Sequence, residues 1–508
     1  GLSIFLETKA MTDPPNDESN ATVSSIDRGP ALRRALGPRI AIAVVVGNVI
    51  GSGIFLKPGN IAAESGNFGL IISVWVFGGV LCIIGALCLA ELAAMLPRAG
   101  GMCVYIREAY GRKVAFLSGW NEFLFAKPAS IGALSIAFTG SLGLSMGWQL
   151  SGFQQAMLAT LVIILLSWVN IMGVLWGGRL QLAVTIVKAL FLGLVAAIPF
   201  ILIPFVEQGI NLANYGTTIE PRQVTLSAQV GVVLLSVMWA YNGWNGVVPL
   251  AEEIQAPQRN LPISLFLGIG ILIVLYLSAN IAYHGVLSME EMAAAGNHAA
   301  EQMLLKLVGP AGMAAMSAVI MCSTFGAINT NLLIAPRVTF AMGRDGVFFR
   351  TLGRVHPVYH TPVPAIVITA LMAIGLVFLV PFGQFLVKDV VTENISSPVF
   401  RLIIESLQDS SIFELLTNFI IFSLGAFVSL AVFAVIVLRI KKPDLERPYK
   451  AWGYPMTPVI FLSVYVWFMI QIYLNKPLES RIGLLFIALG IPVYFLYQKW
   501  SSSLNKER

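Results

Sequence analysis

Two short polar interruptions break otherwise apolar stretches of this chain. Gly51-Ser52-Gly53 forms the first, and the segment from Trp239 to Asn245 forms the second. Glycine in a helix interior costs about 1 kcal/mol relative to alanine, so Gly-Ser-Gly indicates a broken helix whose free N–H groups suit a carboxylate. The alternative is a packing notch of small residues between helices. Unwound carbonyls in the second interruption suit an ammonium group, and an α-amino acid carries both charges.

A lysine stands alone inside a further apolar stretch. An ammonium group in a membrane interior costs several kcal/mol unless it is paired or hydrated, so Lys188 is a functional candidate. Two roles are open: a fixed cation that replaces a bound Na⁺ and joins the first apolar run to the eighth, or a group that loses and regains a proton. The structural alternative is a lysine that snorkels to the interface, but position 188 lies about 12 Å deep at 1.5 Å per residue.

The other ionisable side chains inside apolar runs are expected to be structural. Glu122 and Lys127 are five residues apart, so they do not quite share a face of an α-helix, and each is expected to find a backbone or water partner. Those nearer the ends of runs are expected to form gate or structural pairs; they are Glu91, Arg337, Glu252 and Glu253.

The composition excludes most soluble classes. The 508 residues are 57% hydrophobic and 11% charged, whereas an ordinary soluble domain has about 25% charged residues. The net charge of +6 comes from Lys and Arg in the loops between apolar runs, which does not indicate nucleic-acid binding. The four cysteines show neither a disulfide framework nor a metal spacing. The runs contain no nucleophile with a base and no phosphate-binding loop, so we expect neither an enzyme nor a cofactor.

Twelve apolar runs are each long enough to cross about 30 Å of hydrocarbon. Only helices satisfy their own backbone polar groups in lipid, and the runs lack the alternation of a membrane barrel, so the sequence predicts an all-α polytopic membrane protein. The runs lie near residues 38–66, 69–96, 114–142, 153–173, 180–205, 226–253, 262–286, 311–341, 364–381, 412–439, 456–474 and 481–499.

The interrupted runs are the first and the sixth, which hold corresponding positions in two halves of five runs each. This pairing is typical of an inverted-repeat transporter whose site lies at the membrane midplane. The predicted domains are a flexible tail (1–37), a first repeat (38–205), a second repeat (226–439), two further helices (456–499) and a C-terminal tail (500–508).

The loops predict the orientation of the chain in the membrane. Lys and Arg are concentrated in alternate loops, which places both termini in the cytoplasm. Two longer loops on the opposite side, 287–310 and 382–411, carry more acid than base and are expected to form short surface helices that cap the outer face. The expected location is a cell membrane, which the chain crosses many times.

Further motifs occur in a fixed order from about residue 38 to 460. They are Gly51-Ser52-Gly53-Ile54-Phe55; Pro97-Arg98-Ala99-Gly100-Gly101 with Tyr105 and Tyr110-Gly111; Lys127-Pro128; Ala240-Tyr241-Asn242-Gly243-Trp244-Asn245 with Glu252-Glu253; and Arg447-Pro448-Tyr449-Lys450 with Tyr454-Pro455. Each motif is weakly specific alone. Together they resemble the L-type amino acid transporter family, part of the amino acid, polyamine and organocation superfamily.

The resemblance implies a LeuT-type fold of two inverted five-helix repeats with two extra helices, Na⁺-independent transport and exchange of amino acids. By position, it implies that Gly51, Ser52 and Gly53 hold the substrate carboxylate. It also implies that backbone groups at the two breaks hold the amino group and line the side-chain pocket; these residues are Val49, Ile50, Trp239, Ala240 and Asn242, with Asn245 beside them. Trp239 matches the aromatic residue that closes the outer gate, and Lys188 matches the lysine that replaces a sodium ion.

Two departures from the family narrow the expected partners and substrates. Animal members bond a heavy-chain glycoprotein through a cysteine between the third and fourth spans, and the loop from Gly143 to Phe153 has none, so no disulfide-linked heavy chain is expected. Relatives that handle cationic amino acids can carry Asp where this chain has Asn242, so neutral L-amino acids are favoured.

Two alternative functions stay open. One is a proton-coupled symporter in which Lys188 titrates, and the other is a sensor that binds amino acids without transporting them.

Overall fold

The computed structural model describes residues 32–203, 209–390 and 412–504, with residues 396–397, 400–401, 404–405 and 408 between the last two ranges. The side chains of 412–420, 478–479 and 500–504 fall outside this description. The described chain is almost wholly helical and contains isolated bridges but no sheet. The all-α fold predicted from the sequence is therefore confirmed, and most of the predicted tail 1–37 lies outside the described residues.

Among the described residues, eleven helical stretches are long and apolar enough to cross a membrane. Their long helices are α4 (Phe68–Met95), α8 (Gly152–Ile171), α9 (Val174–Ile201), α11 (Pro257–Val286), α14 (Pro310–Arg344), α15 (Val363–Val387), α17 (Ile412–Lys441), α18 (Met456–Asn475) and α19 (Pro477–Leu504). One stretch is composite: α6 (Arg112–Asn121) continues through the π-helix η1 (Glu122–Ala126) into α7 (Lys127–Met146). Another joins α1 (Pro38–Val49) to α2 (Gly53–Leu56) across a break.

The predicted sixth span is broken, as the first is. It begins as α10 (Leu226–Ala240), unwinds, and ends in the 3₁₀ helix η3 (Val248–Glu253). The helix therefore ends within the interruption that the sequence predicted at residues 239–245. The remaining short elements are α3 (Pro58–Ser65), α5 (Met102–Tyr110), η2 (Leu212–Gly216), α12 (Met289–Ala295), η4 (Gly296–His298), α13 (Ala299–Val308) and η5 (Arg350–Gly353).

The two loops predicted to form capping helices differ in outcome. Loop 287–310 contains α12 and α13, so the predicted short helices are present, and their placement on the outer face stays a prediction. Loop 382–411 begins later than predicted, because α15 continues to Val387, and much of the remainder lies outside the described residues. The C-terminal tail predicted from residue 500 is also shorter, since α19 continues to Leu504.

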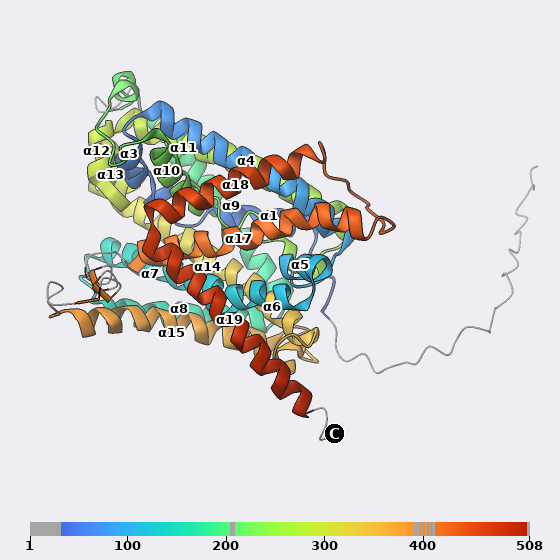
Figure 1. The fold of residues 1–508 in the computed structure, drawn as a ribbon. Coiled ribbons are helices and arrows are strands. Elements are labelled where there is room, and N and C mark those ends of the chain that lie inside the picture. The colour runs from blue at the N-terminus through green and yellow to red at the C-terminus, as the bar shows by residue number, and fades with distance from the viewer. Residues whose placement is uncertain are drawn as a thin grey trace, which may run out of the picture.

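The helices form one bundle with α1 near its middle (Figure 1). The helix α1 packs against α9, α11 and α14, while α8 and α15 pack against each other along one side. The short helices α3, α12 and α13 lie at one end of the bundle, and α5 and the C-terminal end of α19 lie at the other (Figure 1). We call the latter the α5 end. The bundle therefore has two chemically distinct ends with the broken helix between them.

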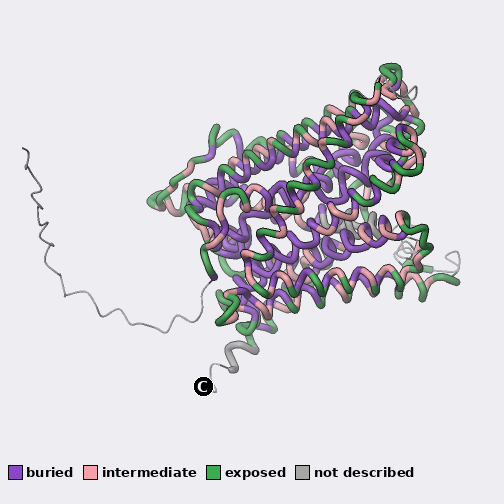
Figure 2. The backbone as a smooth tube through the Cα atoms, turned by 180° about the vertical axis from the view of Figure 1, so that it is seen from behind, coloured by how far each residue is buried: buried purple, intermediate pink, exposed green. Residues whose placement is uncertain are grey.

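The outer faces of the helices suit contact with lipid. Figure 2 shows that buried residues are concentrated between the helices, whereas exposed residues run along the outside. Large apolar side chains are among the exposed ones, for example Leu161, Leu190 and Leu371. Such an apolar outer surface would be costly in water and is favourable in hydrocarbon. The chain is thus a multi-pass membrane protein.

Candidate functional site

The two breaks predicted from the sequence lie against each other. A Cβ atom on Gly53, at the start of α2, would lie 2.9 Å from the Cβ atom of Ala240, at the end of α10. Only glycine permits this close approach of two backbones. The segment after α10 turns at Gly243, whose φ of +95° also favours glycine, and the Asn48 side chain on α1 donates to the Gly243 carbonyl at 3.0 Å.

A central cavity opens where the breaks meet. The residues that line it are Asn48, Val49, Gly51, Ser52, Gly53, Lys127, Ser130, Leu134, Trp239, Asn242, Gly243 and Asn331. The Ser52 side chain is 1% exposed and its hydroxyl has no hydrogen-bond partner. At the start of α2, the N–H groups of Phe55 and Leu56 donate to the Ser52 carbonyl, whereas those of Gly53 and Ile54 have no preceding helical carbonyl to donate to. A buried hydroxyl and free N–H groups at one point form a donor set suited to an anion.

The structure brings together six of the nine predicted substrate-binding residues. Val49, Gly51, Ser52, Gly53, Trp239 and Asn242 line the central cavity. Ile50 is fully buried beside it and Ala240 lies beneath Gly53, so neither lines the cavity. Asn245 lines a neighbouring cavity instead. The segment after α10 turns between Asn242 and Asn245, so Asn242 lines both cavities, whereas Asn245 lines the neighbouring one.

Lys188 on α9 lies fully buried beneath the first break. Its ammonium group donates to the carbonyl of Gly47 and, at 2.6 Å, to that of Ile50, and lies 3.5 Å from that of Ser323 on α14. The lysine therefore joins α1 to α14 and is buried inside the bundle. A cation at the C-terminal end of α1 is favourable, because the last carbonyls of a helix carry partial negative charge.

Sequence reasoning missed two hydroxyl groups that contact the breaks. The Tyr276 hydroxyl on α11 lies 2.8 Å from the Val49 carbonyl and 3.0 Å from the Ala240 carbonyl, so it bridges the ends of α1 and α10. The Ser323 hydroxyl lies 2.8 Å from the Ile50 carbonyl. Both residues are polar side chains inside apolar runs, and that is the signal that would have identified them.

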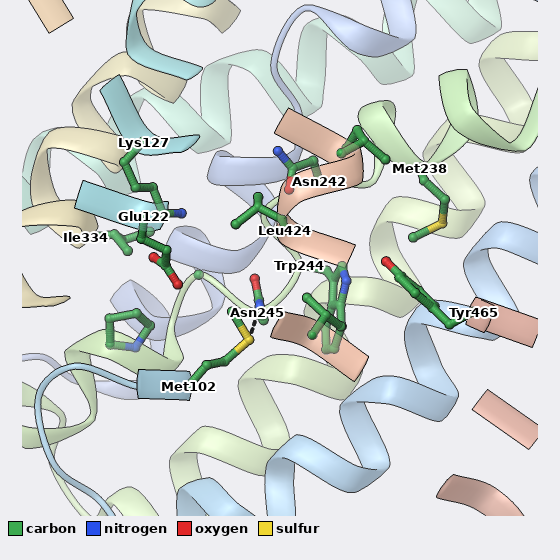
Figure 3. A pocket seen from close by; sticks show the side chains of 14 residues that line it. Met102, Glu122, Lys127, Met238, Asn242, Trp244, Asn245, Ile334, Leu424 and Tyr465 are labelled. Atoms are coloured by element: carbon green, nitrogen blue, oxygen red, sulfur yellow. Dashed lines mark hydrogen bonds between the residues drawn. The ribbon is translucent and has the colours of Figure 1, made fainter. Parts of the chain in front are cut away.

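A second cavity adjoins the first and contains an acid and a base (Figure 3). Glu122 and Lys127 both line it, contrary to the expectation that they occupy different faces. The reason is the π-helix, in which the Lys127 N–H donates to the Glu122 carbonyl five residues earlier. A wider helical turn brings residues five apart onto one face. Lys127 and Asn242 line both cavities.

The α5 end is held by ion pairs, as expected for the remaining ionisable residues. Arg337 donates to both carboxylate oxygens of the buried Glu253, at 2.8 and 3.0 Å. Arg344 contacts Glu252 at 2.8 Å and Arg439 contacts Glu91 at 2.6 Å.

The same end has a further ion pair on α5 itself. Lys442 donates to Glu108 at 2.7 Å, and this hydrogen bond lowers the pKa of the Glu108 carboxyl. Together these pairs join α14, η3, α4, α5 and the end of α17.

Comparison with known proteins places this site in a family. Residues 36–496 match the family model for amino acid permease. The chain is 31% identical to the large neutral amino acids transporter small subunit 2 of Mus musculus, over 97% of this chain and 86% of the relative. It is 28% identical to the serine/threonine exchanger SteT of Bacillus subtilis, over 93% of this chain and 98% of the relative. It is 27% identical to the b(0,+)-type amino acid transporter 1 of Mus musculus, over 95% of this chain and 91% of the relative.

These matches extend over both broken helices and nearly all of the described bundle. The predicted family resemblance is therefore confirmed across the chain and not only at its motifs. This chain belongs to the amino acid permease family.

Proposed function

We propose that this permease exchanges neutral L-amino acids across a cell membrane by alternating access, with the substrate main chain held between the two breaks. The observation that carries the proposal is the buried Ser52 hydroxyl, which lines the central cavity without a hydrogen-bond partner. A substrate carboxylate there accepts hydrogen bonds from this hydroxyl and from the first N–H groups of α2. Relatives named as a neutral amino acid transporter and as an exchanger support the same activity.

The charge of the central cavity supports neutral substrates. Among the described residues that line this cavity, Lys127 is the one with a charged side chain. Asn242, which lies within the second break, is uncharged. A positive charge repels a cationic substrate side chain, and no carboxylate from these lining residues offsets that repulsion. Neutral amino acids meet no such barrier.

The position of Lys188 supports transport without Na⁺. Its ammonium group contacts backbone carbonyls of α1 and α14, which are the kind of ligand that a sodium ion would need. A permanent cation there keeps the first break in place without a bound ion. The same lysine supplies the alternative mechanism, in which it releases a proton during transport.

The proposed organisation follows from the two breaks. Residues 38–205 and 226–439 form the inverted repeats, each opening with a broken helix, and residues 456–499 add two helices. Both termini lie in the cytoplasm, so the α5 end faces the cytoplasm and α12 and α13 face outward. The four cysteines lie in α4, α5 and α14, which supports a chain that acts without a disulfide-linked heavy chain.

Uptake into proteoliposomes tests the proposal. Purified protein is reconstituted without Na⁺, with the lumen either empty or filled with unlabelled leucine, and labelled leucine is added outside. We expect uptake that requires the filled lumen and is unchanged by added Na⁺, with labelled lysine as the cationic control that is not taken up. Equal uptake into empty vesicles contradicts exchange. Uptake into empty vesicles that increases with an inward proton gradient supports the proton-coupled alternative, and binding without uptake supports the sensor.

A further inference from the structure

The second cavity contains a carboxylate, that of Glu122, which the proposed function does not use. It lies between the π-helix η1, the start of α5, the segment after α10, and α17 and α18. Figure 3 shows Glu122 and Lys127 projecting into it from one side, with Asn242 and Asn245 across from them. An acid and a base thus face the same space as two amide groups.

Glu122 differs from two other buried carboxylates. Glu253 and Glu91 each accept hydrogen bonds from an arginine. Glu122 is 4% exposed, and no described residue forms an ion pair or a hydrogen bond with its carboxylate; the half-buried Lys127 attracts it electrostatically from a greater distance. Removing an ion from water costs several kcal/mol unless it gains partners. The pair is therefore positioned to receive a ligand with complementary charges.

The π-helix is the feature that makes this arrangement possible. An α-helix would direct Glu122 and Lys127 to different faces, whereas the five-residue turn directs both into the cavity. The wider turn has poorer hydrogen-bond geometry than the α-helix, and such turns occur often at functional sites. The geometry is consistent with a backbone distortion kept for binding.

The cavity matches an amino acid in charge and polarity. The ammonium group of a zwitterion suits Glu122 and its carboxylate suits Lys127. Opposite the charges, Leu424, Val428 and Tyr465 provide an apolar wall for a neutral side chain. A ligand with only one charge would leave the other group without a partner.

The cavity adjoins the central site. Lys127 and Asn242 line both cavities, so the two cavities are neighbours. Met102 at the start of α5 and Pro249 in η3 line its far side, next to the ion pairs of the α5 end.

We propose that this cavity is a second amino acid site, between the central cavity and the α5 end, in which Glu122 binds the substrate ammonium and Lys127 its carboxylate. This second site takes the same neutral amino acids as the central cavity, so the inference rests on the proposed function. It holds the substrate after it leaves the central cavity and before it reaches the α5 end.

Equilibrium binding of labelled leucine to the purified full-length protein is the first test. We expect two leucine molecules per chain in the unmodified protein and one in Glu122→Gln. Val428→Phe fills the cavity from α17 without altering either charge, and this variant is also expected to bind one leucine per chain. Glu291→Gln is the matched control, because Glu291 is an exposed acid on α12 paired with Lys306 at the other end, and it keeps two.

Transport from each side is the second test, in proteoliposomes sorted by orientation. Loss of a charge-assisted hydrogen bond in Glu122→Gln raises the KM for leucine at the α5 end about ten-fold, while the KM at the opposite end changes less than two-fold. A pair with only a structural role would change both equally.

Three outcomes overturn the second site: one leucine per chain in the unmodified protein, two leucines in folded Glu122→Gln, or equal KM changes at both ends. No leucine binding at all contradicts the proposed function instead, so the two failures are distinguishable. If neither variant folds, the number of leucine molecules bound per unmodified chain still decides whether a second site exists.

Discussion

The break between α1 and α2 is held by side chains from three other helices, α9, α11 and α14, whereas the break after α10 is held mainly by the first break itself. Lys188 on α9 and Ser323 on α14 contact the carbonyls at the end of α1. At the second break, Gly243 receives its hydrogen bond from Asn48 on α1, and Ala240 packs under Gly53 of α2. The first break is thus anchored to the surrounding bundle, and the second is anchored to the first.

This difference has a mechanical consequence for alternating access. A movement of the first break displaces the atoms that hold the second, so the two breaks move together. Tyr276, whose hydroxyl contacts carbonyls of both, reinforces the coupling from α11. Substitutions that release the first break should therefore affect transport most, and those that act only between the breaks should affect it less.

Lys188→Met tests the anchor of the first break and should have the largest effect. It removes at least two hydrogen bonds from a charged group to α1 carbonyls. Hydrogen bonds to charged groups contribute about 1.5–3 kcal/mol each, so the initial rate of leucine exchange falls about 100-fold or more. Lys306→Met, a lysine of α13 in an exposed ion pair, is the matched control and keeps its rate. Full activity in Lys188→Met would contradict the anchor.

Gly53→Ala tests the close approach of the two breaks. The added Cβ would overlap Ala240, and overpacking costs about 1–3 kcal/mol, so exchange falls about 10- to 100-fold. Gly375→Ala on α15 is the control, because its Cβ would meet no atom within 4 Å and the residue lies outside the proposed substrate site. We expect this control to retain its activity. Equal losses in the two variants would show that the contact between Gly53 and Ala240 does not explain the effect.

Asn48→Ala tests whether the second break depends on the first. The side chain donates to Gly243 at 3.0 Å and accepts from Asn331 at 3.3 Å. Hydrogen bonds between membrane helices average about 0.6 kcal/mol, so losing both raises the KM for leucine roughly seven-fold. Asn475→Ala serves as the control, since Asn475 contacts a carbonyl of its own helix, α18. An unchanged KM in Asn48→Ala would show that Gly243 alone holds the second break.

Tyr276→Phe tests the bridge between the ends of α1 and α10, and its effect should be the smallest. Removal of one hydroxyl changes the exchange rate by about two- to three-fold. Tyr283→Phe is the control on the same helix, because the Tyr283 hydroxyl is buried without a hydrogen-bond partner and its removal is expected to leave the rate unchanged. A larger loss in the control than in Tyr276→Phe would refute the bridge.

Much of the fold was predictable because its signals are local. Apolar runs long enough to cross hydrocarbon identified the spans. Gly51-Ser52-Gly53 identified the first break, and the polar and aromatic residues from Trp239 to Asn245 identified the second. The face shared by Glu122 and Lys127 was not predictable, because the spacing of two residues assumes an α-helical turn and the chain adopts a π-turn there. The end of α15 was misjudged because Pro381 and the polar residues after it do not stop a helix that is already formed.

The sequence by itself determined that this protein is an all-α membrane protein, where its helices break and that a lysine lies deep within it, since each of these depends on residue type and short-range order. Only the tertiary structure decided which groups satisfy the broken backbone. Lys188 meets the Gly47 carbonyl across 141 positions of the chain, and Tyr276 meets the Val49 carbonyl across 227. Exposed carbonyls in lipid must find donors, but the donor is chosen by how helices far apart in sequence pack together.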